Sequence, residues 1–231
     1  MFDILHQNSD FIVINKHPNI SVHKDDGDTS LLLELAKESG DKQLYLVHRL
    51  DKMTSGILLI ARHQLAASEL SQAFANRTVQ KFYLAIGVKK PKKKQGAVIG
   101  DMQRSRRASW KLLNSKENPA VTQFFSLPAG TSSDDGKAQR FFLCKPHTGK
   151  THQIRVALKS VGSAILGDPI YGDQSKADRG YLHAYQISFE YQGERHTFQC
   201  LPKHGTQWMR DEIQQALELW HKPATLSWPA L

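Results

Sequence analysis

Side chains able to perform acid–base or nucleophilic chemistry are concentrated in the segment YLVHRLDKMTSGILLIAR, residues 45–62. Six polar or charged residues lie within eight positions: His48, Arg49, Asp51, Lys52, Thr54 and Ser55. The apolar run GILLIA follows at once, and a continuous apolar run of this length is typical of a buried strand. A carboxylate between an arginine and a lysine, at the start of such a strand, indicates either a charged surface loop or an active site.

Other familiar chemical motifs lack essential residues. GKT at 149–151 suggests a phosphate-binding loop, but the glycine required five positions before Gly149 is Cys144 in this chain. HRLD at 48–51 is similar to a kinase catalytic loop, yet no matching asparagine or glycine-rich loop is present. The eleven histidines show no zinc-ligand spacing, so metal ligation is not expected.

The positive charge is concentrated in one part of the chain. Net charge is +9, and residues 77–116 contain twelve Lys or Arg against one acid, Asp101, so the other 191 residues sum to −2. KKPKKK (89–94) and RSRR (104–107) lie within this segment. Such a stripe is the usual electrostatic footprint of a phosphate-backbone binder. A solvated loop is the alternative, and an anionic membrane is a weaker third because no amphipathic basic helix accompanies the lysines.

Composition indicates a globular soluble protein, with 40% hydrophobic and 23% charged residues. A length of 231 residues suits one large domain or two small ones. No window approaches 18 apolar residues, and the first residues lack the features of a signal peptide. Cys144 and Cys200 are expected to be buried, reduced thiols, which favours a cytoplasmic location.

The hydrophobic patterns predict an α+β fold with a mostly antiparallel sheet. Strands are predicted at 11–16, 56–62, 81–88, 123–127, 140–146, 181–191 and 195–201. Turns are predicted at Asp135-Gly136 and at Gln192-Gly193. Helices are predicted at 31–39 (after the candidate caps Thr29 and Ser30), 64–76, 151–162 and 206–220. Segment 89–118 has the composition of a basic insert and is expected to be the least ordered part.

The sequence HRLDKMTSGILLIA resembles, nearly residue for residue, the catalytic motif of RluA-type pseudouridine synthases, H-R-L-D-x-x-T-S-G followed by an apolar strand. The resemblance continues in order over roughly residues 10–203, most of the chain. Its further segments are DFIVINKHPNISVH (10–23), KFYLAIG (81–87), NPAVTQFF (118–125), HTGKTHQIRVALKSVGSAILGDPIYG (147–172) and YLHAYQISF (181–189). It implies a pseudouridine synthase-like mixed sheet flanked by helices and loops, with an RNA-binding cleft.

The resemblance also implies a single catalytic domain over residues 1–231, with a basic insert at about 89–118. The small N-terminal RNA-binding domain of many relatives is not expected, because Asp51 comes too early to leave room for it. Two turns depart from the family pattern: N-K-P-x-G is replaced by NKHPN (15–19), and His-Pro after the late strand is replaced by Glu190-Tyr191. Both lie away from the catalytic motif, so they affect turn geometry and substrate contacts rather than the reaction.

The implied reaction breaks the uracil–ribose bond, turns the base and rejoins it through carbon. Asp51 is assigned as the nucleophile, or as a base at the sugar. Arg155 matches the family arginine that pairs with this carboxylate and offsets its desolvation, although a place on a predicted helix would by itself favour a surface charge. Tyr83 matches the tyrosine that stacks on the flipped base, and strand alternation places it opposite Phe82.

Three basic residues complete the predicted site. Arg49 matches an arginine that contacts RNA near the vacated position, where a guanidinium can stack and bind phosphate. Lys52 and Lys81 could contact the RNA backbone, with solvated charge as the alternative. No step requires a metal, a nucleotide or redox chemistry, so no cofactor is expected. The expected partner is ribosomal or transfer RNA, with no membrane, and the expected state is a monomer.

Two other functions stay open. One is a catalytically silent RNA-binding module of the same fold. The other is a hydrolase that cleaves a glycosidic bond, which would normally show a pair of acids. The candidate for a second carboxylate is Asp168, in GDPIYG, and its place in a turn favours a structural role.

Overall fold

The structure, a computed structural model, describes residues 1–22, 30–106, 108–131, 136, 138–172 and 177–231. Contacts between residues divide the chain into two compact units. Unit 1 comprises residues 1–81 and 183–202, and unit 2 comprises residues 82–182 and 203–231. A single catalytic domain over residues 1–231 stays a prediction.

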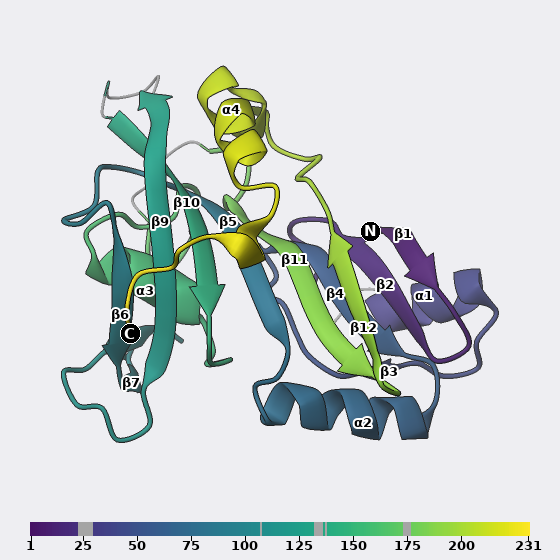
Figure 1. The fold of residues 1–231 in the computed structure, drawn as a ribbon. Helices are drawn as coiled ribbons and strands as arrows, with labels where there is room; N and C mark the ends of the chain where they lie inside the picture. The colour runs from purple at the N-terminus through teal and green to yellow at the C-terminus, as the bar shows by residue number, and fades with distance from the viewer. Residues whose placement is uncertain (23–29, 107, 132–135, 137, 173–176) are drawn as a thin grey trace. The chain divides into compact units, whose positions relative to one another are not determined.

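Unit 1 is built on a sheet whose buried strand is the apolar run of the HRLD motif. Strands β1 (Phe2–Gln7), β2 (Phe11–Lys16), β4 (Ser55–Ala61) and β11 (Leu182–Tyr191) lie side by side in this order (Figure 1). The short β3 (Tyr45–Leu46) pairs with β4, and β12 (Glu194–Gln199) pairs with β11. All these pairs are antiparallel except β4 with β11, which is parallel. Every residue of β4 is buried, which confirms the predicted central strand.

Two helices pack within unit 1. Helix α2 (Gln64–Ala75) lies against β3 and β4, and its buried Ala66 and Leu70 join a core cluster supplied by β2, β4 and β11 (Figure 1). Helix α1 (Leu31–Ser39) ends at Gly40, whose φ of 75° is the left-handed conformation that glycine tolerates. Ser30 precedes the helix but makes no side-chain capping bond, and the second candidate cap, Thr29, lies outside the described residues.

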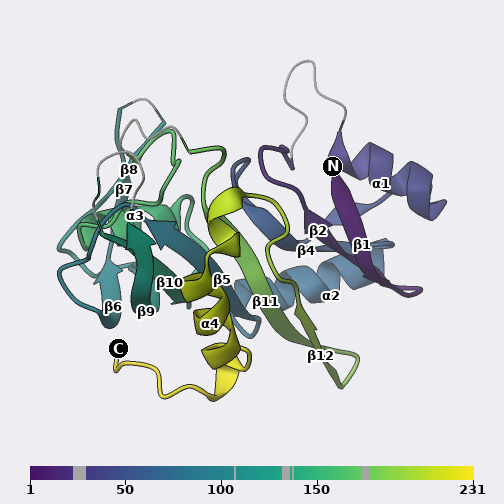
Figure 2. The same ribbon diagram turned by 90° about the horizontal axis from the view of Figure 1, so that it is seen from above.

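Unit 2 forms a layered arrangement around four antiparallel strands. Their order is β5 (Gln80–Gly87), β10 (Ala138–Pro146), β9 (Ala120–Thr131) and β6 (Gln95–Gly100). Helices α3 (Gln153–Ser160) and α4 (Asp211–Leu219) lie on opposite sides of β9 and β10 (Figures 1 and 2). The alternation of β10 explains this, because Phe141 packs on Trp220 beside α4 whereas Phe142 packs on Phe124 of β9.

The predicted fold class, α+β with mostly antiparallel strands, is confirmed. The hairpin of β11 and β12 is also confirmed, and its turn residues Gln192 and Gly193 have φ of 51° and 79°. Two successive positive φ values are those of the tight turn that matches strand twist. The other predicted turn includes Asp135, which lies outside the described residues. Among the described helices, none has the length and apolar character to cross a bilayer.

The structure differs from the sequence prediction in the basic segment. Residues 89–118 were expected to be the least ordered, yet they contain β6 and the hairpin of β7 (Met102–Arg104) with β8 (Trp110–Leu112). Strand β6 forms because it pairs along β9 and buries Val98, which outweighs the basic composition on either side. Arg107 of the RSRR run lies outside the described residues.

The predicted C-terminal helix over 206–220 is interrupted. A 3₁₀ helix, Thr206–Met209, precedes α4, and Arg210 between them is extended, with φ −66° and ψ 140°. Its guanidinium donates hydrogen bonds to Ala129 O at 2.8 Å and to Gln139 Oε1 at 2.6 Å. These bonds to β9 and β10 hold the break in place. Strand β1 is an addition that the sequence patterns did not predict.

Candidate active site

Asp51 lies in a tight turn between β3 and β4 of unit 1. Its carbonyl oxygen accepts the N–H of Thr54 at 3.0 Å. Leu50 and Met53, on either side, are each only 5% exposed, whereas Asp51 is partly exposed and Lys52 exposed. The apolar neighbours therefore anchor the turn in the core and leave the charged side chains at its outer side.

A buried ammonium group supports this turn from beneath. Lys16, at the end of β2, is fully buried, and its Nζ donates to the carbonyl oxygens of His17 at 2.9 Å, Ile20 at 2.8 Å and Lys52 at 3.2 Å. Three acceptors match the three N–H groups of an ammonium. Lys16 thus joins the NKHPN turn to the turn that carries Asp51, a role that the sequence analysis missed.

Replacing Lys16 with methionine is expected to destabilise unit 1 by about 3 kcal/mol, because buried carbonyls lose their donor at roughly 1–3 kcal/mol each and relax only in part. Denaturant unfolding would measure the loss, and hydrogen exchange of the Thr54 amide would report the loosened turn. Lys37→Met is the control, since Lys37 is exposed and is paired with Glu34 at the surface. Equal effects of the two substitutions would contradict the anchoring role.

The other side of the turn is fixed by a buried chain of hydrogen bonds. Ser55 Oγ lies 2.8 Å from His183 Nδ1, and His183 Nε2 lies 2.8 Å from Cys200 O. A carbonyl oxygen only accepts, so Nε2 carries the proton and Nδ1 accepts from the serine hydroxyl. Gly56, with φ of 107°, follows; a Cβ there would lie 2.3 Å from Ala184 O. The Ser-Gly pair therefore lets β4 approach β11 closely.

His48 replaces a backbone acceptor beside β4. The β3–β4 pairing stops at Leu46, and His48 Nε2 then accepts the N–H of Leu59 at 2.9 Å. The imidazole stacks on Phe74 of α2, with ring centroids 4.4 Å apart and planes 16° apart. Burial, together with the charge of Lys81, lowers the pKa of His48 to about 3. The ring is therefore neutral at ordinary pH, as its acceptor role requires.

Replacing His48 with glutamine is expected to flatten the pH dependence of stability between about pH 7.5 and about pH 5.5. As pH falls below 6.5, His48 takes up a proton in the unfolded chain, while the folded chain excludes it until about pH 3. The free energy of unfolding of the wild type should therefore fall with pH, and this part of the fall disappears when glutamine supplies a non-titrating acceptor. Denaturant titrations of both proteins at the two pH values measure this. An equal fall in the free energy of unfolding in the wild type and in His48→Gln would refute it.

The remaining predicted basic residues of unit 1 differ in exposure. Arg49 and Lys52 are exposed and can meet a ligand directly. Lys81, on β5, is partly buried, and its Nζ lies 5.7 Å from the centroid of Phe74. Burial lowers the pKa of Lys81. Phe74 therefore contacts both residues: its ring stacks on His48 and makes a cation–π contact with Lys81.

Arg155 of unit 2 is buried in α3, with 3% of its surface exposed. Its Nε donates to Asp168 Oδ2 at 2.7 Å and its Nη2 donates to Asp168 Oδ1 at 2.8 Å, a two-point pair. The alternative of a helix-surface charge is therefore wrong. Burial alone would raise the pKa of Asp168, but the hydrogen bonds and charge of Arg155, with the N–H groups of Tyr171 and Ile170, lower it.

Tyr171 connects Arg155 to the basic hairpin of β7 and β8. Its ring centroid lies 5.1 Å from the guanidinium carbon of Arg155. Its hydroxyl accepts the N–H of Trp110 at 2.7 Å and lies 2.9 Å from His152 Nδ1. Sequence reasoning did not assign a role to Tyr171, and its place in the GDPIYG turn was the only available signal.

Tyr83 lies on β5, opposite Cys144 of β10. It is partly exposed, whereas Phe82 is fully buried and packs on Trp228 at a centroid distance of 5.7 Å. This difference agrees with the predicted opposite orientation of the two rings. Burial raises the pKa of Cys144, so this thiol stays protonated.

The six predicted site residues are divided between the two units. Unit 1 contains Arg49, Asp51, Lys52 and Lys81. Unit 2 contains Tyr83 and Arg155. Their convergence on one RNA site stays a prediction.

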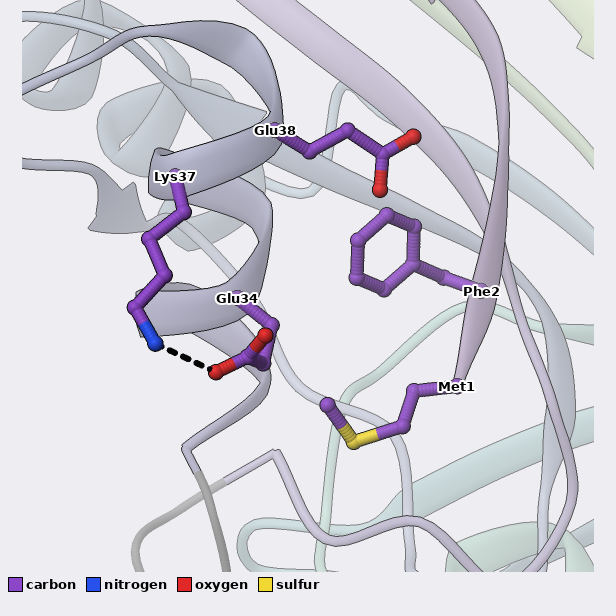
Figure 3. Close-up of a pocket in the computed structure, with 5 residues that line it drawn as sticks. All are labelled: Met1, Phe2, Glu34, Lys37 and Glu38. Atoms are coloured by element: carbon purple, nitrogen blue, oxygen red, sulfur yellow. Dashed lines mark hydrogen bonds and ion pairs between the residues drawn. The ribbon is translucent and has the colours of Figure 1, made fainter.

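A separate pocket lies within unit 1 between β1 and α1. It has a volume of about 420 Å³ and is lined by Met1, Phe2, Glu34, Lys37 and Glu38 (Figure 3). Lys37 and Glu34 are paired at 2.8 Å, as the dashed line in Figure 3 marks. None of the predicted site residues lines it. Across the part of the chain that the structure describes, no three His, Cys, Asp or Glu side chains are grouped to hold a metal ion.

Residues 10–160 match the family model described as RNA pseudouridylate synthase. The chain belongs to the RNA pseudouridine synthase family and is accordingly an isomerase that acts on RNA. An uncharacterized RNA pseudouridine synthase of Haemophilus influenzae is 44% identical over 219 residues, which cover 94% of this chain and 95% of that protein. The RluA-type resemblance is therefore confirmed.

Other relatives are longer than this chain. Ribosomal large subunit pseudouridine synthase D of Nitrosomonas europaea is 34% identical over 203 residues, which cover 80% of this chain but only 56% of that protein. Among solved structures, human RNA pseudouridylate synthase domain containing 4 has a TM-score of 0.69 at 26% identity, covering 93% of this chain and 91% of that one. Human RNA pseudouridylate synthase domain containing 1 has a TM-score of 0.77 at 24% identity, covering 96% of this chain and 95% of that one. This likeness supports the fold alone.

Proposed function

We propose that this chain converts a specific uridine of ribosomal or transfer RNA to pseudouridine, with Asp51 as the nucleophile. The observation that carries the proposal is the rigid support of the Asp51 turn. Lys16 holds the turn through the Lys52 carbonyl, and Ser55 is fixed to His183 on the other side. A nucleophile placed by buried neighbours loses little freedom when it reacts. Relatives named ribosomal large subunit pseudouridine synthase C and D favour ribosomal RNA.

The proposed reaction is balanced without a cofactor. The N1–C1′ bond between uracil and ribose breaks, the base turns, and a C5–C1′ bond forms. Carbon 5 loses one proton and N1 gains one, so substrate and product are isomers. Asp51 acts at the sugar while the base is free.

The remaining predicted residues serve binding and electrostatics. The target base leaves its stack, at a cost of about a few kcal/mol, and Tyr83 stacks on it. Arg49 fills the vacated position, because a planar guanidinium can both stack and bind phosphate. Arg155 keeps the Asp51 carboxylate ionised, and Lys52 and Lys81 contact the RNA backbone.

The test uses ribosomal and transfer RNA prepared without modifications. Each RNA is incubated with the wild type or with Asp51→Asn, and pseudouridine is mapped by carbodiimide labelling and primer extension. A new stop that appears only with the wild type supports the proposal and identifies the target. RNA binding without any stop would favour the silent binding module. Release of free uracil would instead favour a glycosidic hydrolase.

A further inference from the structure

Residues 88–94, called the lysine loop below, connect β5 to β6 in unit 2. Its sequence is VKKPKKK, and all five lysines are exposed: Lys89, Lys90, Lys92, Lys93 and Lys94. Pro91, in the middle of the loop, is buried. The loop therefore turns Pro91 inward and its charges outward.

Backbone hydrogen bonds fasten one side of the lysine loop to the end of α3. The N–H of Val88 donates to Ala164 O at 2.9 Å, and the N–H of Lys92 donates to Val161 O at 2.9 Å. Val161 is the C-cap residue that directly follows α3. A helix end thus serves as the fixed support of the loop.

Serine hydroxyls fasten the loop at two further carbonyl groups. Ser163 Oγ donates to Lys89 O, and Ser126 Oγ of β9 donates to Lys94 O at 2.7 Å. Both bonds use the lysine backbone and leave the side chains available. The loop is consequently held at its first and last lysines, and its ammonium groups are presented from a fixed backbone.

The positive charge of the loop is not neutralised by any described residue. Within the described part of the chain, none of its five ammonium groups has an ion-pair or hydrogen-bond partner. Five like charges within six positions repel one another, and a bound polyanion would relieve this repulsion. The loop also lacks aromatic, amide and hydroxyl side chains that could identify a base. Its chemistry suits phosphate contacts, which position a nucleic acid without reading its sequence.

We propose that the lysine loop is a sequence-independent docking surface for the phosphate backbone of the substrate RNA, outside the target nucleotide. The inference rests on the proposed function for the identity of its partner. Arg155 lies six residues before Val161, so the supported end of α3 is about 9 Å along the helix axis from the proposed active-site arginine. The loop therefore holds RNA that flanks the target, while Asp51 determines the reaction.

The test compares two triple variants with equal charge change. Lys92, Lys93 and Lys94 are replaced with glutamine in one, and the exposed Lys42, Lys203 and Lys222 are replaced with glutamine in the other. RNA affinity is measured across a salt series in an Asp51→Asn background, so that the substrate is not consumed. The loop variant should reduce the slope of log affinity against log salt by about 3, roughly one per phosphate contact, and the control variant should leave it unchanged.

Turnover separates this inference from the proposed function. With Asp51 intact, the loop variant should raise KM and leave kcat unchanged at saturating RNA. An unchanged salt slope, or equal losses in both triple variants, would overturn the docking surface. Binding of the wild type, but not the loop variant, to phosphatidylserine vesicles together with an unchanged RNA slope would assign the loop to a membrane. A reduced slope without pseudouridine formation by the wild type would uphold docking and reject the proposed function.

Discussion

Replacing Asp51 with asparagine is expected to lower the rate of pseudouridine formation by at least about 10³-fold, because a general base contributes 10²–10⁴ and a nucleophile commonly more. Folding should be unaffected, since the bond that closes the turn uses the Asp51 carbonyl, which the substitution keeps. RNA binding should be retained or strengthened, because one negative charge is removed beside a polyanion. Single-turnover kinetics and binding titrations on the same RNA measure the two effects separately.

Glu194→Gln is the matched control, because it makes the same carboxylate-to-amide change at an exposed position of β12 in the same unit. It should leave the rate unchanged. Asp51→Asn retaining more than about a tenth of the wild-type rate would exclude the nucleophile assignment, since no catalytic group of this kind is so dispensable. If Asp51→Asn and Glu194→Gln were equally inactive, the loss of rate would follow from removing a negative charge anywhere in the unit and not from the position of Asp51.

The Asp51 turn and its strand could be predicted because their signals are contiguous in sequence. The apolar run of β4 follows the charged residues directly, so one window contains both the strand and the side chains at its start. Local patterns of this kind determine local structure, and the structure agrees with them.

The contacts of Lys16 and His48 could not be predicted because their partners are backbone groups elsewhere in the sequence. The Nζ of Lys16 reaches the carbonyl of Lys52, 36 residues further on. His48 likewise binds the backbone N–H of Leu59. Backbone donors and acceptors are identical at nearly every position, so no pattern of residue types reveals which one a buried side chain will meet.

The burial of Arg155 was misjudged from periodicity for a similar reason. A helix at the surface normally exposes one face, and an arginine is expected there. All residues from Gln153 to Leu158 are buried instead, because α3 packs on β8, β9 and β10. The GDPIYG turn covers Arg155 itself with Asp168 and Tyr171. Only the resemblance to a family favoured a functional arginine at this position.

Replacing Asp168 with asparagine is expected to destabilise unit 2 by about 3–5 kcal/mol, because Arg155 would keep a buried charge without its carboxylate. The Asp168 side chain is fully buried and that of Arg155 is 4% exposed, so solvent cannot compensate. For a protein of this size the loss corresponds to a fall in Tm of about 10 °C. Calorimetry, with hydrogen exchange of α3 as a local readout, measures it.

The double variant Arg155→Met with Asp168→Leu is the decisive comparison, because it removes both charges and fills the space with apolar groups. It should be markedly more stable than Asp168→Asn while lacking activity, since removing a whole buried pair is often nearly neutral. If both variants lose stability equally, shape rather than charge holds the GDPIYG turn against α3. Tyr171 would then be the main contact, through its ring on Arg155 and its hydroxyl on Trp110.

The pH dependence of this pair gives a second, independent test. The folded protein holds the pKa of Asp168 below its ordinary value, so the pair contributes its full stability above the ordinary carboxyl pKa. As pH falls from about 4 through the lowered folded pKa, the carboxylate becomes protonated and the contribution is lost. The stability difference between wild type and Asp168→Asn should therefore be constant near neutral pH and shrink in acid. A difference that stays constant in acid would show that Asp168 does not hold Arg155 through its charge.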